Sequence, residues 1–408
     1  MSKKLIKSSA ILFVGSMVAN ASGYFFHLAL GRILSPAEYG TLGVLLAIFT
    51  IVTVPVTAIQ NTAAKIFSQL KSKKSEINFI LQQVSRRLVK FSALIFLVFI
   101  AFSLFTYQFF NLPSYVGLVL IGLSIVFIFH LAWNRGVMQG LFDFSDLSFN
   151  YATEGIIKLV FGVLIGYLFL KAEYTILSIT ISFLIAYILS INYINRYRQT
   201  TRPHRRTKIN QSKYMTEALR MTAGTLGILF FISIDLIFAK KFLSEYDAGF
   251  YTALSTLGKV AFFAPLSIAT AFFPYASKET SQRKRFKLLI SAFLLVLITV
   301  LGVVALYLLF PQQIFDFLFA GKYGQVGSLL AIMGVAIGLV GIAQLLINYL
   351  LSQSGWLFAW AMLFSGIFQV TAYLLYHDNV TLFVTMTLVS AVFMLILTSW
   401  ALIQKERL

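Results

Sequence analysis

Long apolar stretches recur along the whole chain, and they constrain the fold more than any other feature of the sequence. Each is long enough, at about 18 residues or more with few charges, to cross a hydrocarbon core of about 30 Å as a helix. Alternation of polar and apolar residues is absent, so the stretches are not strands of a membrane barrel. We therefore predict an all-α polytopic membrane protein with twelve transmembrane helices. Their expected ranges are 8–30, 40–67, 87–111, 114–141, 147–170, 174–196, 217–240, 249–276, 287–310, 325–351, 355–376 and 380–403.

Charged residues are scarce and cysteines are absent, which excludes several classes of protein. Asp, Glu, Lys and Arg make up 12% of the 408 residues, against about 25% in soluble domains. Without cysteine the chain has no disulfide, no thiolate nucleophile and no cysteine-bound metal. The four histidines are scattered and no phosphate-binding Gly-Lys-Ser/Thr loop is present. We expect a protein that is not an enzyme, with no catalytic residues, no metal site and no cofactor.

Lysine and arginine gather on one side of the predicted membrane. Of 33 such residues, 25 lie at the termini or in loops on the N-terminal side, and 5 lie in the opposite loops. Cytoplasmic loops carry an excess of this kind. We therefore predict a multi-pass protein of the cell (plasma or inner) membrane with both termini in the cytoplasm. The net charge of +19 then reflects topology and contact with membrane lipids, and we expect no nucleic-acid partner.

The longest polar segment divides the predicted helices into six and six. It runs from Arg196 to Lys213 and contains Pro203. We predict an N-terminal six-helix lobe over residues 1–196, a cytoplasmic linker over 197–215 and a C-terminal six-helix lobe over 216–408. Because each lobe starts on the same side, a pseudo-two-fold axis along the membrane normal should relate them.

The two halves share a motif at an offset of 209 residues. Leu30–Thr41 reads LGRILSPAEYGT, and Ala239–Phe250 reads AKKFLSEYDAGF. Ser35 and Gly40 recur as Ser244 and Gly249. An acid near a helix start suits the helix dipole, and glycine permits a turn or close packing. The candidate residues of this outer-loop repeat motif are Arg32, Glu38, Gly40, Asp247 and Gly249.

One proline falls within a predicted span of each half, at nearly the same offset. Pro55 lies in the second span and Pro265 in the eighth. Each removes a helical hydrogen bond and should kink its helix. The kinks are candidate hinges for rocking of the halves, and the alternative is that they only shape the packing.

Four short motifs in order carry a resemblance to a known family. They are Leu30–Gly40, the pair DLIFAK (235–240) and DAGFY (247–251), FPYAS (273–277) and FLFAGKY (317–323). Together they resemble the polysaccharide transporter branch of the multidrug/oligosaccharidyl-lipid/polysaccharide exporter (MOP) superfamily, the Wzx-like O-antigen and capsule flippases. The resemblance covers essentially the whole chain. The chain lacks two further C-terminal helices and the arginine-rich first helix of lipid II flippases, which disfavours a peptidoglycan precursor as substrate.

The resemblance implies a function. It implies export of a polyprenyl-diphosphate-linked oligosaccharide from the inner to the outer leaflet by alternating access, for surface polysaccharide biosynthesis. It also implies a cationic cavity for the diphosphate and sugars. Other polysaccharide-assembly membrane proteins are candidate partners.

Charges inside predicted spans are costly and therefore mark candidate functional residues. Arg135 and Glu154 can pair between neighbouring helices, and Glu154 and Lys158 share a helix face at a spacing of four. Two bases facing one acid predict a cationic site for a diphosphate, and the alternative is a structural ion pair. We expect Arg135→Ala and Lys158→Ala to fold normally and transport poorly. Asp235 and Lys259 are expected to form a gating or structural pair, unless Asp235 binds a coupling proton or sodium ion.

Two other functions remain open at this point. A cation-coupled small-molecule exporter of the same superfamily should show acids as its dominant buried charges, whereas bases outnumber acids here. A membrane-embedded glycan polymerase or acyltransferase needs convergent catalytic groups. The most prominent outer segment, 311–325, has one acid and no histidine.

Overall fold

The computed structural model describes residues 3–69, 74–196, 211–278, 281–352 and 357–407, and the chain is helical over most of these ranges. Twelve helical segments in the described ranges are long and apolar enough to cross a membrane. The first is Ile11–Ile33 and the last is Val380–Lys405. The predicted all-α fold with twelve spans is confirmed.

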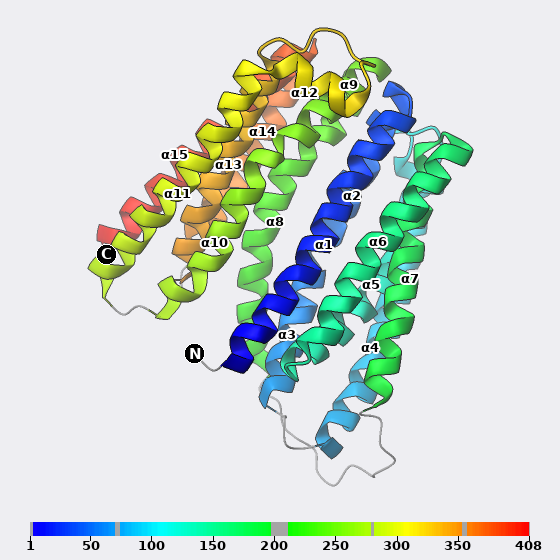
Figure 1. Cartoon of the computed structure of the whole chain (residues 1–408), viewed down its shortest axis with the longest axis vertical. Coiled ribbons are helices and arrows are strands. Elements are labelled where there is room, and N and C mark those ends of the chain that lie inside the picture. The colour runs from blue at the N-terminus through cyan, green and yellow to red at the C-terminus, as the bar shows by residue number, and fades with distance from the viewer. Residues whose placement is uncertain (1–2, 70–73, 197–210, 279–280, 353–356, 408) are drawn as a thin grey trace. The chain divides into compact units, whose positions relative to one another are not determined.

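Two compact units make up the chain, and Figure 1 shows the helices of each running side by side as a bundle. Unit 1 comprises Met1–Leu34 and Val52–Thr222, and unit 2 comprises Ser35–Ile51 and Ala223–Leu408. Unit 1 contains α1 (Lys3–Ile33), α3 (Pro55–Gln69), α4 (Lys74–Thr106), α5 (Val116–Gly140), α6 (Phe144–Phe169) and α7 (Ala172–Asn195). Unit 2 contains α2 (Pro36–Val52), most of α8 (Gln211–Phe242), α9 (Glu245–Gly258), α10 (Val260–Lys278), α11 (Gln282–Leu309), α12 (Pro311–Phe319), α13 (Leu329–Ser352), α14 (Leu357–Leu375) and α15 (Val380–Arg407).

The grouping of α2 with the second half was not expected from the sequence. Its neighbours in the chain, α1 and α3, belong to unit 1. The predicted linker, 197–215, falls mainly on residues outside the described ranges. The lobes 1–196 and 216–408 therefore stay predictions.

The 209-residue repeat is visible in the helix boundaries. Helix α1 ends at Ile33 and α2 begins at Pro36, while α8 ends at Phe242 and α9 begins at Glu245, each pair separated by the same offset. The serine before each helix caps it. The Ser35 hydroxyl accepts from the Glu38 amide at 3.3 Å, and the Ser244 hydroxyl accepts from the Asp247 amide at 3.2 Å. The acids of the motif thus lie in the first turns of α2 and α9, where they suit the helix dipole.

Both proline-containing spans are interrupted near their middles. Helix α2 ends at Val52 and α3 starts at Pro55, because the residue before a proline disfavours helical geometry. In the eighth span the interruption is at Lys259, between α9 and α10, and α10 runs on through Pro265. The break therefore lies six residues before the proline that was expected to mark it.

A short helix, α12, was not anticipated from the sequence, and it completes an aromatic cluster in unit 2. We define this aromatic cluster as Tyr39, Tyr246, Phe250, Phe315, Phe319 and Tyr323. The ring centroids of Tyr39 and Phe319 lie 5.7 Å apart, and those of Phe319 and Tyr323 lie 5.9 Å apart. Burial raises the pKa of the Tyr323 hydroxyl, so the group stays protonated. The cluster packs α2, α9 and α12 together.

Helices α1 and α6 pack closely in unit 1 because small residues line their contact. A Cβ added at Gly155 would lie 2.7 Å from the Ala19 Cα, and one added at Gly15 would lie 2.8 Å from the Ser148 Cα. At such distances the two backbones nearly touch. This packing holds the face of α6 that carries Glu154 and Lys158 in a fixed position against α1.

Candidate functional site

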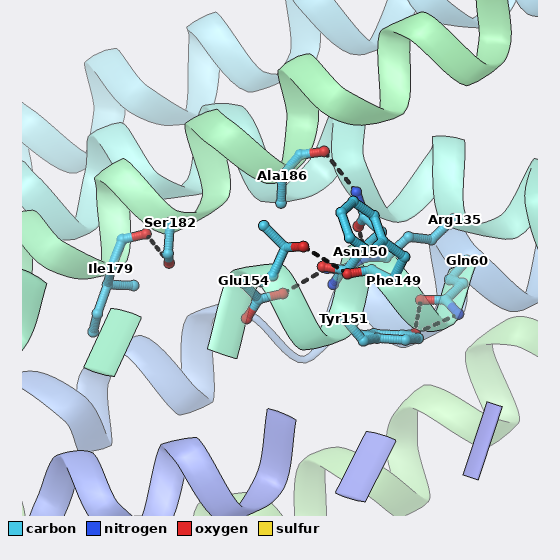
Figure 2. Close-up of polar contacts among 10 residues, drawn as sticks. Gln60, Arg135, Phe149, Asn150, Tyr151, Glu154, Ile179, Ser182 and Ala186 are labelled. Atoms are coloured by element: carbon cyan, nitrogen blue, oxygen red, sulfur yellow. Dashed lines mark hydrogen bonds and ion pairs between the residues drawn. The ribbon is translucent and has the colours of Figure 1, made fainter. Parts of the chain in front are cut away.

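The predicted pair between Arg135 and Glu154 is present and joins α5 to α6. The guanidinium Nη2 lies 2.7 Å from a Glu154 carboxylate oxygen. The same side chain donates from Nε to the Asn150 side-chain oxygen at 2.7 Å and from Nη2 to the Asn150 carbonyl at 3.3 Å. Figure 2 shows these groups converging between the helices. Arg135 is 6% exposed, so its charge is compensated almost wholly by protein groups.

Polar groups from three helices surround the arginine. Its guanidinium lies over the Tyr151 ring, 4.1 Å from the centroid. The Tyr151 hydroxyl is hydrogen bonded to the Gln60 side chain of α3 at 2.8–3.0 Å. Gln60 also donates to Gln139 at 3.0 Å. The Asn150 amide donates to the Ala186 carbonyl of α7 at 2.7 Å, which extends the network to a fourth helix.

Lys158 adds a second positive charge one helical turn beyond Glu154. It interacts electrostatically with Glu154, and its ammonium lies 6.0 Å from the centroid of the Phe26 ring. Gly23 leaves room for it, because a Cβ there would lie 3.4 Å from the ammonium nitrogen. Unlike Arg135, Lys158 is partly exposed. This cationic cluster, defined as Arg135, Glu154 and Lys158, carries two bases against one acid.

A second group of buried polar side chains lies in unit 2 around Asp235. This carboxylate is 1% exposed. Its Oδ2 accepts from the Tyr251 hydroxyl at 3.1 Å and from the Ser255 hydroxyl at 3.0 Å. The Tyr251 hydroxyl is also hydrogen bonded to Thr387 at 2.9 Å, and Thr387 in turn to Tyr373 at 2.8 Å. Helices α8 and α9 thus meet at this acid, and hydroxyls of α15 and α14 are linked to it through Tyr251.

Some oxygens of this region are left without partners. Within the described residues, Asp235 Oδ1 has no side-chain partner, and neither Gln369 Oε1 nor Ser390 Oγ has any hydrogen-bond partner. Lys259, at the break between α9 and α10, interacts electrostatically with Asp235. A buried acceptor without a donor is costly, so this site is suited to taking up a proton or a cation. No group of three or more His, Asp or Glu that could hold a metal is found in the described part of the chain.

The structure brings the predicted residues together in three separate places. Arg135, Glu154 and Lys158 meet in unit 1, and Asp235 and Lys259 interact in unit 2. In the repeat motif, Arg32 lies in the last turn of α1, whereas its acids and glycines lie at the starts of α2 and α9. The residues that surround these charges were not predicted as their neighbours: Asn150, Tyr151, Tyr251, Ser255, Tyr373 and Thr387. The only signal for them was a hydroxyl or amide on an otherwise apolar helix, which also marks ordinary helix packing.

Solved structures with the same fold are membrane transporters. A multidrug resistance MATE family transporter of the MOP superfamily, in an inward-facing conformation, is 13% identical with a TM-score of 0.75, covering 95% of this chain and 98% of that one. A MOP superfamily transporter from Pyrococcus furiosus, described by its reversed binding-pocket polarity, is 13% identical with a TM-score of 0.64, covering 98% and 95%. The lipid II flippase MurJ, in an inward closed conformation, is 13% identical with a TM-score of 0.64, covering 97% and 87%. The chain therefore has the two-lobe, twelve-helix MOP fold.

Comparison of the sequence with known proteins shows which family the chain belongs to. None of the curated proteins matches the chain significantly. The model of the polysaccharide biosynthesis protein family matches residues 5–280, more than half of the chain. This match confirms the family resemblance noted from the motifs, and the shared fold agrees with it. The chain has twelve helical segments within its described ranges that are long and apolar enough to cross a membrane, and it belongs to the polysaccharide biosynthesis protein family.

Proposed function

We propose that this protein is a flippase that moves a polyprenyl-diphosphate-linked oligosaccharide from the inner to the outer leaflet by alternating access. The observation that carries the proposal is the cationic cluster of unit 1. Glu154 balances Arg135 through a 2.7 Å ion pair, so Lys158 leaves the cluster with net positive charge. Such a charge inside a transmembrane region is expensive and fits an anionic ligand such as a diphosphate.

Within the cluster, Lys158 is the better candidate for direct contact with substrate. Arg135 is engaged on every side by Glu154, Asn150 and the Tyr151 ring. Lys158 is partly exposed and is held by a weaker contact with Phe26. We assign the diphosphate contact to Lys158 and the positioning of α5 against α6 to Arg135. The amides and hydroxyls nearby suit sugar hydroxyls.

We further propose that an ion gradient drives the cycle through Asp235. Its Oδ1, which has no side-chain partner among the described residues, can accept a proton, or it can bind sodium together with neighbouring oxygens. The change in charge at Asp235 would alter its attraction for Lys259, which lies at the α9–α10 break. The ion gradient would then act on the conformation of the α9–α10 break within unit 2.

The test is a direct flipping assay. Purified protein is reconstituted in liposomes with fluorescent polyprenyl-diphosphate oligosaccharide, and loss of inner-leaflet label is followed against protein-free vesicles under imposed proton or sodium gradients. We expect Lys158→Ala to slow flipping by at least about tenfold, the size of one lost hydrogen bond to a charged group. Lys171→Ala, which removes an exposed loop charge, is the matched control and should flip at the wild-type rate.

The result also separates the alternatives. Asp235→Asn should retain flipping down a substrate gradient and lose the response to the ion gradient. Wild-type flipping by well-folded Lys158→Ala would remove the cationic site from the proposal. If no glycolipid moves, the second candidate is a cation-coupled small-molecule exporter, which the MATE-like fold favours, and dye efflux from the same vesicles would detect it.

A further inference from the structure

Three neutral polar side chains of unit 1 form a group beside the cationic cluster. We define this polar triad as Gln60 of α3, Gln139 of α5 and Tyr151 of α6. Gln60 donates to the Gln139 side-chain oxygen at 3.0 Å, and it is hydrogen bonded to the Tyr151 hydroxyl at 2.8–3.0 Å. Figure 2 shows the second of these contacts. All three residues are partly exposed, so the triad is not sealed inside the helix packing.

One end of the triad is open to a further partner. Gln139 accepts a hydrogen bond through its side-chain oxygen, whereas its amide nitrogen donates to no group in the described part of the chain. A primary amide carries two N–H donors, and a donor that reaches no protein acceptor needs water or a ligand. Because Gln139 is partly exposed, a molecule that enters from solvent can supply that acceptor.

The triad and the cationic cluster are joined through one face of α6. Tyr151, Glu154 and Lys158 are spaced by three and four residues, so their side chains lie along one stripe of the helix. The Arg135 guanidinium lies 4.1 Å from the centroid of the Tyr151 ring, which holds the triad against the charged groups. Tyr151 and Lys158 are about 10 Å apart along the helix axis, at about 1.5 Å per residue. The stripe therefore has a positively charged end and a neutral, hydrogen-bonding end.

The two ends suit the two parts of a lipid-linked glycan. A diphosphate is an anion and is bound best by bases, whereas a sugar ring presents uncharged hydroxyl and amide groups that pair with amides and phenols. A site that bound the diphosphate alone would not distinguish a glycosylated lipid from a bare one. A site built to hydrogen bond a ligand hydroxyl rejects the analogue without it, because the polar groups of the site are then left unpaired.

We propose that the polar triad is a sugar-binding subsite for the sugar attached directly to the diphosphate. Gln139 contacts the sugar, and Gln60 is a positioning residue that engages the Gln139 oxygen and the Tyr151 hydroxyl. The proposal rests on the proposed function, since it takes the diphosphate contact of Lys158 as given. It adds a specificity determinant that is separate from the charge, because the triad reports whether the lipid diphosphate carries a sugar.

Binding competition with the purified protein tests the subsite. Polyprenyl diphosphate, either bare or carrying one glucose, galactose or N-acetylglucosamine, competes with a fluorescent polyprenyl diphosphate. We expect at least one glycosylated lipid to bind about tenfold more tightly than the bare one, the size of two hydrogen bonds. Gln139→Leu should reduce this ratio of affinities to about one, because leucine has a similar size and no amide. Gln108→Leu removes an exposed amide of unit 1 outside the triad and should keep the wild-type ratio.

Tyr151→Phe is the second variant, should Gln139→Leu unfold. It keeps the ring beside Arg135 and removes the hydroxyl that orients Gln60, and it should lower the ratio about threefold through one lost hydrogen bond. The thermal unfolding midpoint of each variant shows whether it is folded. A wild-type ratio in the folded triad variants, or no preference for any glycosylated lipid, would overturn the subsite.

Lys158→Ala separates this inference from the proposed function. The variant should bind bare and glycosylated lipid more weakly to the same extent, so the ratio should stay at its wild-type value. If the ratio depends on Gln139 while the reconstituted protein moves no glycolipid, the subsite stands and the flippase function fails. If the protein flips glycolipid and the ratio does not depend on Gln139, the function stands and the subsite fails.

Discussion

At the scale of single residues, Arg135 and Lys158 carry the same charge but have different surroundings. Arg135 bonds to the side chains of Glu154 and Asn150 and to the Asn150 carbonyl, and its guanidinium lies over the Tyr151 ring. All of these groups belong to α6. Lys158 interacts electrostatically with Glu154, and its ammonium lies 6.0 Å from the centroid of the Phe26 ring. The two residues should therefore respond differently to truncation, although the sequence suggested the same behaviour for both.

We predict that Arg135→Ala destabilises the protein much more than Lys158→Ala. Removing one partner of a buried ion pair costs about 3–5 kcal/mol, because the remaining groups stay buried and lose their donor. Arg135→Lys keeps the charge but loses the forked geometry of the guanidinium. The stability of this variant should therefore lie between those of the wild type and Arg135→Ala. Thermal unfolding in detergent checks the order. Equal losses for the two alanine variants would contradict the assignment of Arg135 to helix positioning.

The sequence predicted which buried charges meet but not what surrounds them. The Arg135–Glu154 pair was foreseen because the two residues lie at similar depth on neighbouring spans. Asn150, Tyr151 and the hydroxyl chain from Asp235 to Tyr373 were not foreseen. Helices buried in a bundle are apolar all round, so periodicity does not show which face of a helix a hydroxyl occupies.

At the scale of elements, two glycines in long spans have opposite environments. A Cβ at Gly155 of α6 would meet the backbone of α1, whereas one at Gly302 of α11 would meet nothing within 4 Å. Gly302 is exposed on the bundle surface. Alanine at Gly155 therefore tests the contact between α6 and α1, whereas alanine at Gly302 tests helix propensity alone.

We expect Gly155→Ala to destabilise and Gly302→Ala to leave stability unchanged or raise it. Forcing α1 and α6 apart costs about 1–3 kcal/mol by overpacking. Alanine at an open helical site gains up to about 1 kcal/mol in propensity. Midpoints of thermal aggregation for the two purified variants check the signs. A stable Gly155→Ala variant would show that α1 moves freely relative to α6.

Helix boundaries were predictable because they depend on local sequence. The repeat offset anticipated matching helix ends, and the structure shows them at Ile33 and Phe242. The break at Lys259 and the helix α12 were not anticipated. The first lies six residues before Pro265, so the proline did not mark its position, and the second is too short to stand out by hydropathy.

At the scale of the whole molecule, the number of spans and the family are established, and the orientation is a prediction. The excess of Lys and Arg on one side predicts cytoplasmic termini. Because the chain lacks cysteine, single introduced thiols report sidedness without background.

We predict that Lys171→Cys, between α6 and α7, reacts with an impermeant maleimide in intact cells. Lys284→Cys, near the start of α11, should react only after the membrane is permeabilised. Both side chains are exposed, so burial does not limit either reaction. The reverse pattern would invert the topology and the direction of export.

The position of α2 also has a consequence for biosynthesis. Helix α9, whose Gly249 lies against Gly40 of α2, is synthesised about 200 residues later. At about 5–20 residues per second, translation leaves the Tyr39 face of α2 without its final neighbour for about 10–40 s. During that interval the nascent helix must remain in the bilayer with its small-residue face against lipid, the insertion machinery or the helices already made. The first helices are therefore inserted before the second span has its final neighbour. That span reaches its final packing only after the first half has left the ribosome.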